Sequence, residues 1–139
     1  MAEGLERFEA AQDEGGTYER AMAEVAAGAK RGHWMWFVYP QLAGLGQSPT
    51  ARFYAIRDEA EARALLAHPV LGPRLRRAMR TAADAPARSA EALLGGIDAV
   101  KLRSSATLFG RVAPEEPVFG EVLDRWYGGE EDRATLALL

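Results

Sequence analysis

Apolar residues recur three and four positions apart along most of this chain, and this spacing limits the folds open to it. The clearest series lie within residues 18–29, 71–82 and 118–127. Positions spaced in this way fall on one face of an α-helix, whereas a half-buried strand alternates apolar and polar residues. The sequence therefore predicts a mainly α, compact multihelical fold with little or no sheet.

Several helix ends carry residues that favour such ends. Ser48 before a proline and Asp58 three residues before a glutamate are typical N-caps. The helix after Asp58 should stop at His68, because the proline that follows disfavours helical geometry in the residue before it. Asp98 is expected to cap a helix that runs to position 109, and Asp132 to cap a last short helix.

Length and composition narrow the class of protein. A chain of 139 residues is expected to form one domain, residues 1–139, without cysteines and with only two histidines. We expect no cofactor and no metal site. A net charge of −3 makes nucleic acid an unlikely partner, and no run is long and apolar enough to span a membrane. The polar, acidic N-terminus lacks a signal-peptide pattern, which predicts a cytoplasmic protein.

The stretch KRGHWMWFVYPQLAGLGQSPTARFY, residues 30–54, holds two of the three tryptophans and one of the two histidines. Its aromatic part, Trp34–Tyr39, is predicted to be a short buried strand. Aromatic clusters usually form core, but Lys30, Arg31 and His33 place polar groups beside this one. Either Trp34 or Trp36 could then stack a base whose phosphates meet the cations.

Two further segments allow a functional and a structural interpretation. GLGQSPT, a glycine-rich turn before a helix, could bind phosphate, although an ordinary turn is the simpler account. In DAVKLRSSATLF, Lys101, Ser104 and Ser105 share one helical face, which could hold a phosphate or a ribose hydroxyl. The same small residues could equally serve a close helix contact. Arginines 74, 76, 77 and 80 are expected to form a solvated helix face.

The segments KRGHWMWFVYPQLAGLG, HPVLGPRL and KLRSSATLF resemble a bacterial family called domain of unknown function 1810, some of whose members are labelled calpastatin. A more distant similarity links SPTARFYAIRDEAEARALLAHPVLGPRLR to the NADAR superfamily, also called YbiA-like. That superfamily is mainly α and acts on ADP-ribose-type N-glycosides. Pro49, Thr50 and Tyr54 match its motif, but Arg52 stands where NADAR proteins carry glutamate.

The NADAR resemblance implies a YbiA-like fold and a nucleotide-shaped pocket more than it implies catalysis, because an arginine cannot replace a carboxylate in glycoside hydrolysis. Our main hypothesis is a pocket protein for a nucleotide or ADP-ribose-like small molecule. In it Lys30, Arg31, Arg52 and Lys101 meet phosphates, while Gln41, Tyr54 and Ser104 hold the ribose. The alternatives are a NADAR-like N-glycosidase and a protein-interaction module without a small-molecule ligand.

Overall fold

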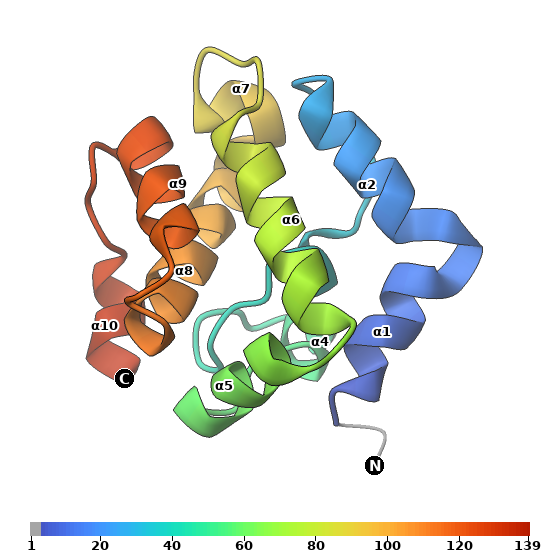
Figure 1. The fold of residues 1–139 in the computed structure, drawn as a ribbon, viewed down its shortest axis with the longest axis vertical. Helices are drawn as coiled ribbons and strands as arrows, with labels where there is room; N and C mark the ends of the chain where they lie inside the picture. The colour runs from blue at the N-terminus through green and yellow to red at the C-terminus, as the bar shows by residue number, and fades with distance from the viewer. Residues whose placement is uncertain (1–3) are drawn as a thin grey trace.

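The chain folds into α-helices joined by short loops, as a computed structural model describes it for residues 4–139 (Figure 1). The predicted mainly α class is confirmed. The helices, in chain order, are α1 (Glu6–Asp13), α2 (Thr17–Ala26), α3 (Met35–Val38), α4 (Pro49–Phe53), α5 (Glu59–Ala67), α6 (Leu71–Ala83), α7 (Ala90–Leu94), α8 (Gly96–Val112), α9 (Pro117–Tyr127) and α10 (Arg133–Leu138). A 3₁₀ turn (Glu14–Gly16) links α1 to α2.

Helix α6 lies between α2 and α9 (Figure 1), and α5 also packs on it. Its buried side chains include Leu75, Ala78 and Met79. Two aromatic side chains donate hydrogen bonds to backbone carbonyls of α6: the Tyr39 hydroxyl to Ala78 at 2.7 Å and the Trp126 indole to Ala82 at 2.8 Å. One hydrophobic core therefore joins the N-terminal and C-terminal halves of the chain.

The predicted strand at Trp34–Tyr39 is wrong, because this segment forms the short helix α3. Aromatic and β-branched residues favour strands when a neighbouring strand is available to pair with. Within residues 4–139 the only bridge of sheet type is a single parallel one between Leu42 and Ile56. The α3 backbone bonds locally instead, and Gln12 donates its side-chain amide to the Phe37 carbonyl at 2.8 Å.

The expected caps at Ser48, Asp58 and Asp132 are confirmed. Each side-chain oxygen accepts a backbone N–H three residues on, at 3.1, 2.9 and 3.0 Å respectively. Helix α5 ends at Ala67 with His68 as its C-cap, as predicted. The capping box is incomplete, because Glu61 accepts from the backbone of Arg57 at 2.9 Å rather than from Asp58.

The expected start of the long C-terminal helix at Asp98 is wrong. Helix α8 begins at Gly96, so Asp98 lies inside its first turn and caps nothing. The reason is Gly95, whose φ of 90° and ψ of 159° belong to a region that only glycine adopts readily. This residue ends α7, and α8 begins directly after it, while the Asp98 carboxylate pairs with Lys30 and Lys101.

Candidate functional site

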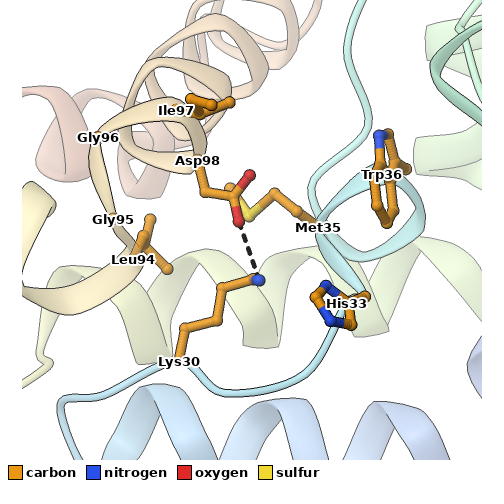
Figure 2. A pocket seen from close by; sticks show the side chains of 9 residues that line it. All are labelled: Lys30, His33, Met35, Trp36, Leu94, Gly95, Gly96, Ile97 and Asp98. Atoms are coloured by element: carbon orange, nitrogen blue, oxygen red, sulfur yellow. Dashed lines mark ion pairs between the residues drawn. The ribbon is translucent and has the colours of Figure 1, made fainter. Parts of the chain in front are cut away.

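A pocket of about 350 Å³ opens between the loop that precedes α3 and the start of α8 (Figure 2). We call it the Trp36 pocket. It is lined by Lys30, His33, Met35, Trp36, Leu94, Gly95, Gly96, Ile97 and Asp98. In Figure 2, His33 and Trp36 stand on one side and the Leu94–Ile97 turn on the other, with Met35 between them. Side chains more than 60 positions apart in the sequence thus share one cavity.

Two lysines meet one carboxylate at this pocket. Lys30 Nζ lies 2.9 Å from an oxygen of Asp98, and Lys101 Nζ lies 3.4 Å from the other oxygen. The Lys30 side chain is 10% exposed, so its ammonium has lost most of its hydration. It also donates to the Gly32 carbonyl at 2.5 Å. Lys101 lies outside the pocket lining, so Lys30 and Asp98 balance one another in the wall, and Lys101 adds one positive charge beside them.

The two tryptophans of the loop have different positions. Trp36 is only partly buried and lines the pocket, with Lys101 Nζ 4.7 Å from its ring centre. Trp34 is 2% exposed and belongs to the core, where it packs 6.1 Å from the Tyr39 ring. Of the two rings proposed to stack a base, the structure leaves Trp36 for that role.

Glu24, on α2, holds the loop before α3 in place. One of its carboxylate oxygens accepts from the backbone of Arg31 at 2.8 Å, from the backbone of Gly32 at 3.0 Å and from the Trp34 indole at 2.9 Å. Burial alone would raise the pKa of Glu24, but these three donors and the nearby Lys30 outweigh it and lower that pKa. An ionised Glu24 therefore positions the residues that carry Lys30 and His33.

The start of α8 forms the opposite wall. No side chain caps this helix end, so backbone N–H groups of its first turn face outward. A methyl group added to Gly95 or Gly96 would meet no other atom within 4 Å, which means that both glycines border open space. Ile97 follows, is 77% exposed and places an apolar side chain at the edge of the pocket.

A second pocket, of about 290 Å³, adjoins the first through His33, which lines both. We call it the Tyr54 pocket. Its lining is Ala11, Glu14, Thr17, Arg20, Glu24, Gly32, His33, Trp34, Phe37 and Tyr54. Tyr54 also borders a smaller hollow beside Trp36 and Gln41. The structure thus brings Tyr54 and Gln41 close to Trp36, as a shared site requires.

Other predicted site residues lie elsewhere. Arg31 is exposed, and Arg52 is exposed and donates to Gln47 at 3.3 Å. Ser104 is buried and donates to Asp132 at 3.2 Å, which favours the helix-contact interpretation of its face. Ser105 is fully buried, and its hydroxyl has no hydrogen-bond partner within residues 4–139. Neither serine lines the Trp36 pocket or the Tyr54 pocket.

Sequence reasoning missed several residues of the site. Asp98 was interpreted only as a helix cap, although a carboxylate three positions before a lysine can also pair with it along a helix face. The Gly95–Gly96 turn and the apolar Ile97 beside it were a signal of an exposed helix start. Glu24 gave no sequence signal, because its role depends on where the loop from residue 31 to 34 lies in space.

Charges outside the pockets are mostly paired. Arginines 74, 76, 77 and 80 each lie within 2.9 Å of a carboxylate, on Asp13, Glu116, Glu19 and Glu121 respectively. This agrees with a solvated helix face. No group of three or more metal-binding side chains occurs among residues 4–139. Over the same part of the chain, no helix is long and apolar enough to cross a bilayer.

The fold and site define an all-α protein with a tryptophan-lined pocket between its third and eighth helices, in whose wall Lys30 pairs with Asp98. The chain belongs to the family described as "Protein of unknown function (DUF1810)", whose sequence model matches residues 2–139. It is 47% identical to the conserved hypothetical protein Rv1873 from Mycobacterium tuberculosis, over 97% of this chain and 95% of that one. The two structures superpose with a TM-score of 0.93. No curated protein matches the sequence. The distant similarity to the NADAR superfamily stays a prediction.

Proposed function

We propose that this protein binds a small anionic ligand with a flat ring, of the nucleotide or ADP-ribose type, in the Trp36 pocket. The observation that carries the proposal is Lys30, a lysine whose side chain is 10% exposed and borders an open cavity beside a tryptophan face.

A buried ion pair is a poor way to stabilise a fold, because removing two charges from water can cost more than their attraction returns. An apolar residue in place of Lys30 would fill the same space without that cost. The Lys30–Asp98 pair is nevertheless in a cavity wall, where a ligand can reach it. Perturbed or desolvated charges in a cleft are typical of binding sites.

The walls suit the two ends of a nucleotide. The half-buried Trp36 ring and the exposed Ile97 side chain offer apolar surfaces for a base. Lys30, Lys101 and the outward N–H groups of α8 favour a phosphate. Arg31 and Arg52, both exposed and outside the pocket lining, are not needed in this arrangement.

Thermal denaturation with and without AMP, ADP-ribose and NAD tests the proposal. A ligand at 100 times its Kd should stabilise the fold by about 2.7 kcal/mol. Lys30→Met and Trp36→Leu should abolish most of this shift, whereas Arg88→Met, which removes an exposed positive charge outside the pocket, should keep it. No shift with any of the three compounds would contradict the proposal.

A second candidate is an N-glycoside hydrolase, and Asp98 is the observation that favours it. Arg52 replaces the glutamate of the NADAR motif, but Asp98 supplies a carboxylate in the pocket wall. Such a group could accept a proton from water while the water oxygen bonds to the anomeric sugar carbon and the C–N bond breaks, its electron pair leaving with the base. Nicotinamide then leaves as a neutral molecule, and a guanine anion takes its proton from solvent water. Lys30 and Lys101 would hold the phosphates in place.

Incubation with ADP-ribosylated guanosine or NAD, followed by chromatography, separates the two candidates. A hydrolase releases free ADP-ribose, and Asp98→Asn should stop that release while Glu115→Gln, a change of the same charge on an exposed residue, should not. Binding of these compounds without release of ADP-ribose would favour the ligand-binding function over the hydrolase.

A further inference from the structure

We propose that the Tyr54 pocket is a second subsite, which receives the sugar end of a nucleotide–sugar ligand whose base and phosphate occupy the Trp36 pocket. This inference rests on the proposed function and specifies the ligand class. The starting observation is that His33, an exposed side chain, lines both cavities. A ligand that leaves one pocket past His33 therefore enters the other.

The two pockets differ in charge. In the Trp36 pocket the cation Lys30 pairs with the carboxylate of Asp98, whereas the Tyr54 pocket has two carboxylates, Glu14 and Glu24. Its one arginine, Arg20, turns back to its own helix start, where it donates to the Gly15 carbonyl and, at 3.1 Å, to the Thr17 hydroxyl. A phosphate would be repelled here, while a neutral group rich in hydroxyls would find acceptors.

Aromatic rings and carboxylates together suit a sugar. Phe37 and Tyr54 lie side by side in the pocket wall, with ring centres 5.3 Å apart. The apolar C–H face of a pyranose or furanose can pack on such rings, while its hydroxyls donate to carboxylates. Glu24 is held ionised by its backbone donors. Glu14 is exposed, and the Thr17 hydroxyl donates to its backbone carbonyl at 2.7 Å rather than to its carboxylate.

Tyr54 adds a donor to these acceptors. Burial, together with the nearby Glu14 carboxylate, raises the pKa of Tyr54, so its hydroxyl stays protonated at neutral pH. That hydroxyl has no hydrogen-bond partner among the described residues, although the ring itself packs against Phe8 and Phe53. A ring oxygen or a hydroxyl of a sugar can accept its proton.

Calorimetric titration with AMP, ADP and ADP-ribose tests the subsite, since the second ligand adds one phosphate to the first and the third adds one ribose to the second. ADP-ribose should bind about tenfold more tightly than ADP, the gain expected from one hydrogen bond to a charged acceptor. Glu14→Gln should remove most of this difference while leaving AMP affinity unchanged, and Tyr54→Phe should weaken ADP-ribose binding more than AMP binding. Tyr54→Phe keeps the ring, and Glu115→Gln is the matched control for loss of one carboxylate.

Two results would overturn the inference, and they have different meanings. If ADP and ADP-ribose bind equally well, or if the variants weaken the binding of AMP as much as that of ADP-ribose, the second subsite is refuted. The proposal for the Trp36 pocket would then still stand. Absence of binding for all three ligands would overturn the proposed function itself, and the subsite with it. A far-ultraviolet circular dichroism spectrum of each variant shows whether lost binding comes from lost folding.

Discussion

Replacing Asp98 by asparagine changes the charge of the Trp36 pocket with little change of shape. Asp98 is the carboxylate that Lys30 and Lys101 share, at 2.9 and 3.4 Å. Asparagine keeps an oxygen as an acceptor but removes the negative charge. The net charge of the three side chains therefore rises from one positive charge to two, and an anionic ligand should bind more tightly.

The size of this gain follows from the distances. A ligand phosphate that contacts the lysines would lie about 6 Å from the Asp98 carboxylate, and their repulsion is about 1 kcal/mol at a dielectric constant of about 50. Its removal should lower the Kd for AMP about fivefold at low salt. The gain should shrink as ionic strength rises, because salt screens exposed charges. Calorimetry at two salt concentrations measures both effects.

The same substitution should lower the free energy of unfolding by about 1–2 kcal/mol. This lies between the small contribution of exposed ion pairs and the larger loss when one partner of a buried pair is removed. Urea denaturation measures it. Weaker AMP binding by a folded Asp98→Asn protein would refute the reasoning, since it would mean that the carboxylate assists the ligand rather than repelling it.

Three further predictions concern single residues. Lys101→Ala should lower the free energy of unfolding by about 1 kcal/mol, more than the loss of a solvated lysine would, because its ammonium contacts both Trp36 and Asp98. Calorimetry should also show that this variant binds AMP more weakly. Glu24→Gln should lose about 1–2 kcal/mol in urea denaturation at pH 7. The folded pKa of Glu24 lies below its unfolded value near 4.5. The difference in unfolding free energy between the unaltered protein and Glu24→Gln should therefore narrow as the pH falls below 4.5. Gly95→Ala should destabilise the fold by about 1–3 kcal/mol through its positive φ, whereas Gly96→Ala should leave Tm nearly unchanged and weaken AMP binding.

Local signals predicted most of the helices because those helices depend on residues close in sequence. Ser48, Asp58 and Asp132 cap their helices through side chains that reach only three positions along the chain. The apolar spacing of residues 71–82 needs no distant partner to mark one face of α6. The family membership follows from sequence alone for the same reason, since it rests on the order of residues.

Contacts between distant segments decided the rest. Trp34–Tyr39 had a strand-like composition, but the described part of the chain, residues 4–139, offers no neighbouring strand to pair with it, and Gln12 supports the helix instead. The placement of Trp34 in the core and Trp36 at the cavity depends on distant side chains, since Glu24 accepts from the Trp34 indole and Lys101 lies over the Trp36 ring. No spacing rule connects Lys30 to Asp98, because 68 positions separate them in the chain. Only the packing of α7 and α8 against the loop before α3 brings that ammonium and that carboxylate within 2.9 Å.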